Sequence, residues 1–235
     1  MKKISSAISA LIVVVTVAAA NAAGRPITVA DLLSIPRISE PQLSPDGTRA
    51  VYTLAVPDVK ANRMARDVWM VTLATSEARA LTTGGHEGRG RWSPDGKSIA
   101  YTATEPKSTA IKDREKKYGE FEIVDQDHRM THLFVLDVAT KKPLTDHLEW
   151  VKFSGASWIG DQGFFYNRYP QPESGKKMAG KNDYQKIYYH KVGTPQSDDK
   201  LIYEDNEHPQ RRQSVGVTED QRFEILGVSD SSAGK

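Results

Sequence analysis

The chain has 235 residues, of which 38% are hydrophobic and 26% charged, values typical of a globular protein with enough apolar side chains for a sizeable core. The formal net charge is only +2, so the composition does not favour a nucleic-acid partner or an acidic membrane surface. The chain contains no cysteine, which excludes disulfide bonds, thiolate metal sites and a cysteine nucleophile.

The first 22 residues have the organisation of a secretory signal peptide. Lys2-Lys3 precedes an apolar stretch, Ala10–Ala20, and Ala20-Asn21-Ala22 is a small-residue cleavage pattern. The apolar stretch is shorter than the roughly 20 residues that a membrane-spanning helix needs. An uncleaved anchor or a buried helix is the alternative. We expect residues 1–22 to be removed on export, leaving a periplasmic or secreted protein without a membrane span.

The sequence Ser-Pro-Asp-Gly occurs at residues 44–47 and again at residues 93–96. Proline presets φ for the first central position of a β-turn, aspartate tolerates the second, and glycine takes the next position with positive φ. Because apolar residues flank both copies, each predicts a hairpin between two antiparallel strands. Degenerate copies of this hairpin follow at residues 157–166 and 215–226.

A second hairpin follows each of the first three turns, at residues 67–82, 132–145 and 186–205. Two hairpins per unit predict a four-stranded antiparallel sheet. The units recur at spacings of 49, 66 and 59 residues between the turn aspartates, which are Asp46, Asp95, Asp161 and Asp220. Repeats of this size with four strands each indicate propeller blades, and a β-sandwich is the alternative fold.

Two inserts, residues 105–130 and 170–185, are rich in charged residues or in Pro, Gly and Lys, and we expect solvated loops or a short exposed helix there. No low-complexity linker divides the chain, so residues 23–235 are expected to form one all-β domain. No second hairpin follows residues 215–226. We therefore expect an incomplete β-propeller of three blades and part of a fourth.

The sequence contains no convincing catalytic group. Neither Ser154 nor Ser174 lies in the G-x-S-x-G pattern of an α/β-hydrolase nucleophile. His128 and His132 have a metal-ligand spacing, but His132 opens an expected strand and no glutamate completes a zinc motif. The remaining histidines form no cluster in sequence; they are His86, His147, His190 and His208. We expect no catalytic residue, no metal and no cofactor in this chain.

The two Ser-Pro-Asp-Gly turns, the second within W-S-P-D-G-K-S-I-A-Y (92–101), resemble the N-terminal β-propeller of the prolyl oligopeptidase family of serine peptidases. Residues 27–54 and 113–145 are similar to its acylaminoacyl-peptidase-like branch, whereas residues 149–209 are similar to the prolyl oligopeptidase branch itself. The change of branch near residues 146–149 suggests a hybrid or misjoined gene.

In that family the propeller caps the active site and admits only short peptides. The resemblance therefore implies short peptide substrates in the full-length parent, and Phe153 as a weak candidate for a substrate-facing residue; a propeller-core phenylalanine is equally compatible. The family's Ser, Asp and His triad lies on a C-terminal α/β-hydrolase domain that this sequence lacks, as it also lacks the family's N-terminal Tyr-x-Trp-Leu-Glu segment. We expect the chain to be inactive alone and to self-associate through the open ends of the propeller.

Two other functions fit parts of the sequence. A non-enzymatic periplasmic propeller of the Tol type, serving as a protein-interaction module, would share the Ser-Pro-Asp-Gly turns, but residues 149–209 argue against it. A metal-centred propeller hydrolase would need acidic or histidine ligands on successive inner strands, and these strands carry mostly Ala, Val, Ile and Phe.

Overall fold

The computed structural model describes residues 25–123, 127, 129–144, 148–149, 151, 156–171 and 183–230. The chain divides into two compact units, Met1–Ile35 and Pro36–Lys235. In the first unit, helix α2 (Val29–Ser34) begins at a capping box. The Thr28 hydroxyl accepts a hydrogen bond from the Asp31 amide, and the Asp31 carboxylate accepts one from the Thr28 amide. The expected signal peptide lies outside the described residues. Within the described ranges, no helix is long and apolar enough to cross a membrane.

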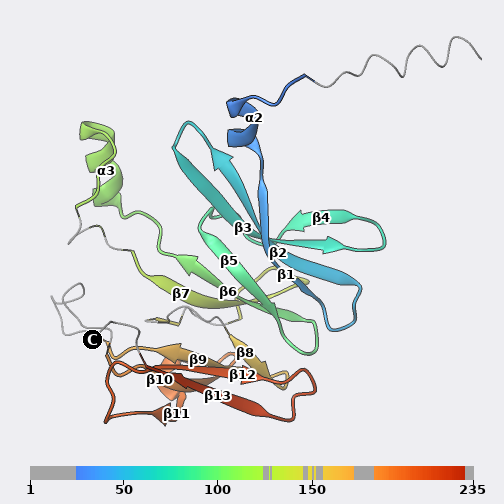
Figure 1. Cartoon of the computed structure of the whole chain (residues 1–235), viewed down its shortest axis with the longest axis vertical. Coiled ribbons are helices and arrows are strands. Elements are labelled where there is room, and N and C mark those ends of the chain that lie inside the picture. Colours follow the sequence, from blue (N-terminus) through green and yellow to red (C-terminus); the bar gives the residue numbers. More distant parts are fainter. Residues whose placement is uncertain are drawn as a thin grey trace, which may run out of the picture. The chain divides into compact units, whose positions relative to one another are not determined.

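The second unit consists of antiparallel sheets whose strands pair in chain order (Figure 1). We number the sheets as blades 1 to 4. Blade 1 contains β1 (Arg37–Leu43), β2 (Arg49–Asp58), β3 (Arg63–Thr72) and β4 (Glu77–Ala80). Blade 2 contains β5 (Glu87–Trp92), β6 (Ser98–Thr104) and β7 (Thr131–Asp137). Blade 3 contains β8 (Ser157–Ile159), β9 (Gly163–Arg168), β10 (Lys186–Lys191) and β11 (Lys200–Glu204). Blade 4 contains β12 (Arg212–Val217) and β13 (Glu224–Ser229). The predicted partial propeller is confirmed.

Blade 2 differs from the expected pattern at its outer edge. The hairpin predicted for residues 132–145 has a full first strand, but its return segment forms only an isolated bridge between Leu136 and Pro143. Proline has no backbone N–H to donate to the ladder, which shortens a strand at this position. Residues 145–147 lie outside the described residues.

The first insert contains the expected short helix, α3 (Thr109–Tyr118). The Ser108 hydroxyl caps its first turn by accepting a hydrogen bond from the Ile111 amide, and Gly119 ends it with φ of 86°. A 3-10 helix, η1 (Gln196–Asp198), lies in the connection between β10 and β11. Most of the second insert, residues 172–182, lies outside the described residues.

The Ser-Pro-Asp-Gly turns close through one repeated hydrogen-bond network. In blade 2 the Ser93 hydroxyl donates to the Asp95 carboxylate at 2.7 Å and accepts from the Ser98 amide at 2.9 Å. The Asp95 carboxylate also accepts from the Lys97 amide at 3.0 Å, and Gly96 has φ of 67°. Blade 1 repeats these contacts around Ser44 and Asp46.

Blade 4 forms the same network although its turn has lost both proline and glycine. Thr218 takes the place of the serine, its hydroxyl donating to Asp220 at 2.6 Å and accepting from the Phe223 amide at 3.1 Å. Gln221 occupies the glycine position with φ of 59°. The third turn is shorter, because Ile159 pairs directly with Gly163.

The blades also repeat a cross-strand aromatic pair at one register position. The pairs are Tyr52 with Trp69, Tyr101 with Phe134, and Tyr166 with Tyr188. The rings of Tyr101 and Phe134 stack with centroids 5.5 Å apart. The shared position of these pairs indicates that their aromatic side chains serve packing of the blades.

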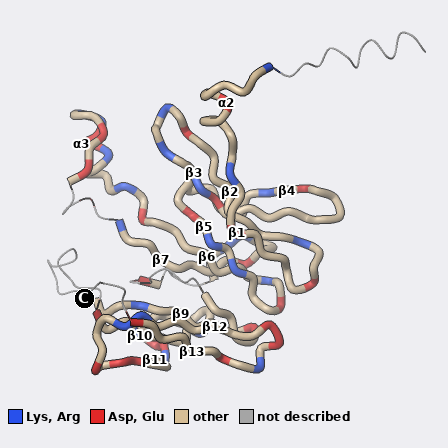
Figure 2. Tube along the Cα trace, viewed as in Figure 1, with Lys and Arg blue, Asp and Glu red and all other residues tan. Residues whose placement is uncertain are grey.

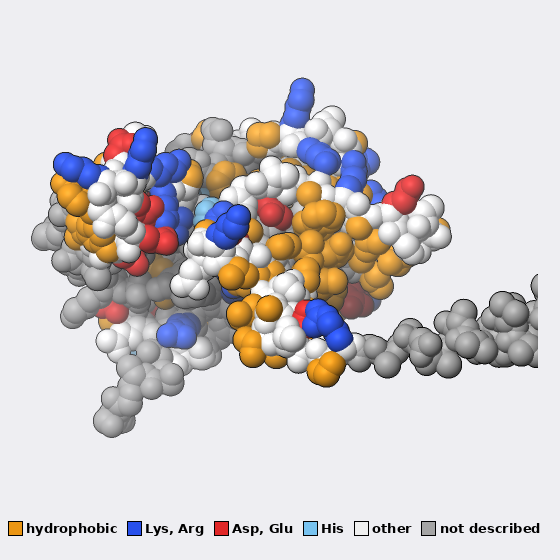
Figure 3. All heavy atoms as spheres, turned by 90° about the horizontal axis from the view of Figure 1, so that it is seen from above, with side chains coloured by type: hydrophobic (Ala, Val, Ile, Leu, Met, Phe, Trp, Pro, Cys, Tyr) orange, Lys and Arg blue, Asp and Glu red, His pale blue; other side chains and the backbone are white. Residues whose placement is uncertain are grey.

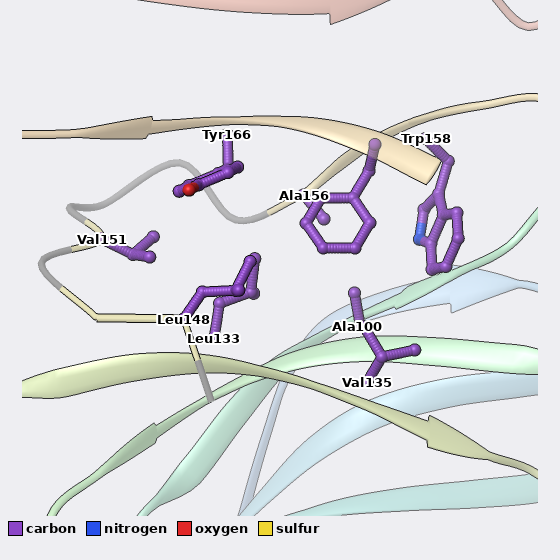
Figure 4. Packing of buried hydrophobic residues seen from close by; sticks show 9 residues of the cluster. Ala100, Leu133, Val135, Leu148, Val151, Ala156, Trp158 and Tyr166 are labelled. Carbon is purple, nitrogen blue, oxygen red and sulfur yellow. The ribbon is translucent and has the colours of Figure 1, made fainter. Parts of the chain in front are cut away.

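Two hydrophobic cores lie between neighbouring blades. The core of blades 1 and 2 consists of Val51, Val68, Met70, Leu81, Trp92, Ile99, Leu136 and Val138. The core of blades 2 and 3 consists of Ala100, Leu133, Val135, Leu148, Val151, Ala156, Trp158, Phe164 and Tyr166 (Figure 4). Successive side chains of β6 and β7 therefore alternate between the two cores, and blade 2 is covered on both faces.

An indole hydrogen bond accompanies each core. Trp92 Nε1 donates to the carbonyl oxygen of Gln42 at 3.3 Å, and Trp158 Nε1 donates to the carbonyl oxygen of Arg91 at 3.2 Å. Gln42 and Arg91 each lie two residues before the turn serine of their blade. Each tryptophan thus joins its own blade to the first strand of the preceding blade.

Candidate functional site

The first strands of blades 1 and 2 carry matching β-bulges. The bulge in β1 contains Glu40 and that in β5 contains Arg89, and both residues have positive φ, 53° and 59°. They lie 49 positions apart, the spacing of the turn aspartates. Arg89 Nε lies 3.7 Å from Glu40 Oε1, so an ion pair connects the two bulges. Bulges re-aim side chains and concentrate near functional sites, which makes this edge the best candidate among the described residues.

A pair of carboxyl groups lies beside these bulges. Asp67 on β3 and Glu87 on β5 interact through their side chains. The Gly85 amide donates to Asp67 at 3.1 Å, and the His86 amide donates to Glu87 at 3.0 Å. Burial raises the pKa of Glu87, and the neighbouring Asp67 raises it further. Burial and a nearby carboxyl group both disfavour the ionised form, so Glu87 keeps its proton to a higher pH than an exposed glutamate does.

His86 lies next to this pair, and its pKa is shifted downward, whereas that of Glu87 is shifted upward. Burial lowers the pKa of His86, and the positive charges of Arg129 and Arg63 lower it further. The imidazole is therefore neutral at neutral pH. A neutral histidine beside two carboxyl groups can exchange protons or bind a polar group, but the same groups also join blade 1 to blade 2.

The charged insert contributes cations to this edge of the blades, and its own charges are largely paired. Lys107 Nζ lies 2.7 Å from Glu115 and 2.8 Å from Glu120. Arg114 forms an ion pair with Asp127. Basic and acidic residues alternate along α3 (Figure 2). The expectation of a solvated, charged segment is confirmed for the described part of this insert.

A second polar network is buried inside blade 3. His190 Nδ1 lies 2.7 Å from Asp199 Oδ1, and the side chains of both residues are at most 1% exposed. The Tyr166 hydroxyl donates to the other oxygen of Asp199 at 2.6 Å, and Gln196 Nε2 donates to the Tyr166 hydroxyl at 3.1 Å. Burial and the Asp199 carboxylate raise the pKa of Tyr166. Gln196 also exchanges two hydrogen bonds with the backbone of Glu149.

A histidine held by a buried carboxylate is the orienting half of a serine-peptidase triad, but this one stabilises the fold. Its ring packs against Phe164, with centroids 5.3 Å apart, and Nε2 is buried without a hydrogen-bond partner among the residues that the structure describes. The rings of His132 and His208 also hydrogen-bond to carboxylates, those of Glu105 and Asp205. A triad histidine would instead face a nucleophile hydroxyl.

These pairs of interacting side chains were not predicted from the sequence. His190 lies on β10 and Asp199 lies between η1 and β11, and only the strand alternation of residues 186–191 could have placed His190 inside. Phe153, the substrate-facing candidate, lies outside the described residues, as do Ser154, Ser174, His128 and His147. By spacing alone, Phe153 precedes Trp158 by five residues, as Glu87 precedes Trp92. The described residues contain no group of three or more His, Asp or Glu side chains arranged to hold a metal ion.

Residues 121–234 match the family model described as "Prolyl oligopeptidase, N-terminal beta-propeller domain". A prolyl endopeptidase of Elizabethkingia miricola is 44% identical over 102 residues, which cover 43% of this chain and 14% of that protein. Prolyl oligopeptidase A of Amanita bisporigera is 46% identical over 98 residues, 39% of this chain and 13% of that protein. Dipeptidyl-peptidase 5 of Porphyromonas gingivalis is 37% identical over 108 residues, 44% of this chain and 16% of that protein.

Solved structures extend the likeness beyond the region of high identity. A structure from a study of two prolyl endopeptidases superposes with a TM-score of 0.61 at 23% identity, covering 85% of this chain and 25% of that one. Prolyl oligopeptidase B from Galerina marginata superposes with a TM-score of 0.57 at 21% identity, covering 83% of this chain and 27% of that one. The chain therefore shares the fold of about a quarter of each of these longer structures.

Proposed function

We propose that the chain is the propeller portion of an exported serine peptidase of the prolyl oligopeptidase family, because residues 121–234 match the model of that family's N-terminal β-propeller domain. In this role the propeller admits short peptides to an active site and excludes larger proteins. The peptide bond is cleaved by a Ser-His-Asp hydrolase domain that other sequence supplies.

The observation that carries the proposal is the 44% identity over 102 residues with a prolyl endopeptidase. The repeated blades and the superposition on prolyl oligopeptidase structures support the same assignment. In the proposed role the propeller positions a peptide, and attack on the peptide bond requires a nucleophile activated by a base, which the hydrolase domain supplies.

Export and the hybrid origin of the gene remain proposals supported by the sequence. The lysines and the short apolar stretch within residues 1–22 support export, and intact mass of the periplasmic protein tests it. A mature species that begins near residue 23 is expected, and one that retains Met1 contradicts export. Genomic sequence across codons 146–149 tests the hybrid hypothesis.

A chimeric enzyme tests the gating function. The segment of the Elizabethkingia miricola prolyl endopeptidase that aligns with this chain would be replaced by the matching residues of this chain. We expect the chimera to retain hydrolysis of a fluorogenic Gly-Pro substrate and to exclude a prolyl peptide several times longer than the natural substrates. The readout is the ratio of kcat/KM for the two substrates, with the unmodified enzyme as control.

Two outcomes would contradict the proposal. A folded chimera that cleaves long and short peptides equally well would show that this sequence does not restrict access. Turnover of the short substrate by this chain alone, after stringent purification, would place an active site within it.

A further inference from the structure

Hydrogen bonds join blades 1 and 2 at both the inner and the outer strands of their interface. Gln42 Oε1 on β1 accepts from the Trp92 amide on β5 at 3.0 Å. At the outer edge, Arg79 on β4 donates to the carbonyl oxygen of Val138, directly after β7, at 3.0 Å. Hydrogen bonds require particular distances and angles, so these contacts fix one blade on the other. We call blades 1 and 2 the first module.

Blades 3 and 4 are joined in the same way. The Ser157 hydroxyl on β8 donates to the carbonyl oxygen of Val215 on β12 at 2.7 Å. Gln185 Oε1, which precedes β10, accepts from the Gln213 amide on β12 at 2.6 Å. We call blades 3 and 4 the second module, and we expect each module to keep its internal arrangement when the other moves.

The contact between the two modules is mainly apolar. The core of blades 2 and 3, which we call the seam, fills it with side chains that are at most 8% exposed (Figure 4). Hydrophobic side chains also gather on the surface seen from above in Figure 3, whereas those of the seam are covered. Among the described residues, a single side-chain hydrogen bond joins the strands across the seam, from Trp158 Nε1 to the carbonyl oxygen of Arg91. Apolar burial is non-directional, so the seam holds the modules together without fixing their relative position.

The connection between the modules changes its hydrogen-bond partner at one peptide bond. Leu148 exchanges two backbone hydrogen bonds with Leu133 on β7 of the first module, at 3.2 and 2.8 Å. The next residue is bound to the second module: the Glu149 amide donates to Gln196 Oε1, and its carbonyl oxygen accepts from Gln196 Nε2, both at 3.1 Å. The sequence resemblance changes branch within residues 146–149 as well. The boundary between the modules therefore lies between Leu148 and Glu149.

A buried network in blade 3 holds Gln196 in place. Gln196 Nε2 donates to the Tyr166 hydroxyl at 3.1 Å, and this hydroxyl donates to Asp199 at 2.6 Å. Asp199 also binds His190 Nδ1 at 2.7 Å, and the side chains of this last pair are at most 1% exposed. Buried polar groups that satisfy one another are rigid. These four side chains, which we call the clamp, keep Glu149 on the second module.

We propose that the two modules are separate cooperative units and that the chain hinges between Leu148 and Glu149. The clamp holds the connection on the second module, so bending is confined to this boundary. When the modules move, the seam opens or slides while the polar contacts inside each module persist. Cooperative units of this kind often coincide with groups of neighbouring strands. This inference does not rest on the proposed function.

Native-state hydrogen exchange of the whole chain, measured by mass spectrometry in low concentrations of urea, tests the division. Two glutamines are matched probes, because the side-chain amide of each binds the backbone of another element. Gln42→Ala removes a contact inside the first module, and Gln196→Ala opens the clamp. Both side chains are partly exposed, so the variants are expected to fold, and circular dichroism checks this. Tyr166→Phe removes only the hydroxyl that holds Gln196 and tests the clamp independently.

We expect Gln42→Ala to raise the exchange rates of the amides of β2, β3, β5 and β6 about tenfold, and to change those of blades 3 and 4 less than about twofold. Gln196→Ala and, to a smaller extent, Tyr166→Phe are expected to show the reverse pattern. If each variant accelerates exchange in all four blades by the same factor, the blades are one cooperative unit and the hinge is wrong. If Gln196→Ala leaves blades 3 and 4 unchanged, or accelerates exchange in β7 as much as in β9, the clamp does not set the boundary.

Discussion

Blades 2 and 4 close with the same turn network but differ in what surrounds their strands. Ser93 and Thr218 make equivalent hydrogen bonds to Asp95 and Asp220, although only the first turn contains proline and glycine. Blade 2 contributes side chains to two cores, whereas β13 of blade 4 exposes most of its residues. The comparison shows that a short local sequence determines the turn, while burial depends on neighbouring blades that the turn does not specify.

The largest expected effect on stability comes from replacing isoleucine with alanine at a buried position of blade 2 and comparing it with the same replacement at an exposed position of blade 4. Ile99 is fully buried between blades 1 and 2, and Ile225 is 61% exposed on blade 4. Ile99→Ala is expected to lower the free energy of unfolding by about 2–5 kcal/mol, because it removes buried methylenes and leaves a cavity. Ile225→Ala is expected to change it by no more than about 0.5 kcal/mol. Urea unfolding at low protein concentration measures both.

Equal destabilisation by the two alanine variants would contradict the comparison. If Ile225→Ala lowers the free energy of unfolding only at high protein concentration, the result would show that a second copy covers this face.

A smaller effect is expected from the turn hydroxyls. Ser93→Ala removes a hydroxyl that is buried and leaves the Ser98 amide and the Asp95 carboxylate without that partner, at a cost of about 1–2 kcal/mol. Thr218→Ala removes the equivalent hydroxyl from a half-buried position, where water replaces it, and a smaller loss is expected. Urea midpoints of the two variants give the ranking, and a larger loss at Thr218 would show that burial does not decide the strength of this network.

The sequence predicted the features that depend on short segments. The turns at Asp46 and Asp95 and the hairpins around them follow from local residue chemistry, and both are confirmed. For residues 105–130 the sequence left solvated loops or a short exposed helix open, and the structure has a helix there. The blade count followed from the repeat of these segments. The outer strand of blade 2 was overestimated, because Pro143 could be read as part of a strand from its flanking residues alone.

The polar groups of the candidate site were not predictable in the same way. Glu40 and Arg89 adopt positive φ without being glycine, and no residue type marks such bulges in a sequence. Asp67 and Glu87 meet only because blade 2 stacks on blade 1, and His190 meets Asp199 only through the register of blade 3. Contacts of this kind depend on tertiary packing, and a repeat of turns does not specify which charged residues will face one another.

The smallest expected effect concerns the carboxyl pair and has a pH dependence of known sign. Burial and Asp67 raise the pKa of Glu87 above its ordinary value of 4.5. A raised carboxyl pKa means that the contribution of Glu87 to stability is fully present below pH 4.5 and is lost as the pH rises through the folded-state value. Glu87→Gln is always neutral and does not lose this contribution.

The variant Glu87→Gln is therefore expected to match the native protein at pH 4.5 and to be more stable at pH 7, by about 0.5 kcal/mol because the carboxyl is not fully buried. Glu224→Gln, at an exposed glutamate on β13 of blade 4, is the matched control and should show no such gain. Urea midpoints at the two pH values measure the difference. If Glu87→Gln loses stability at pH 7, the ionised carboxylate stabilises the contact between blades 1 and 2, and the raised pKa of Glu87 is contradicted.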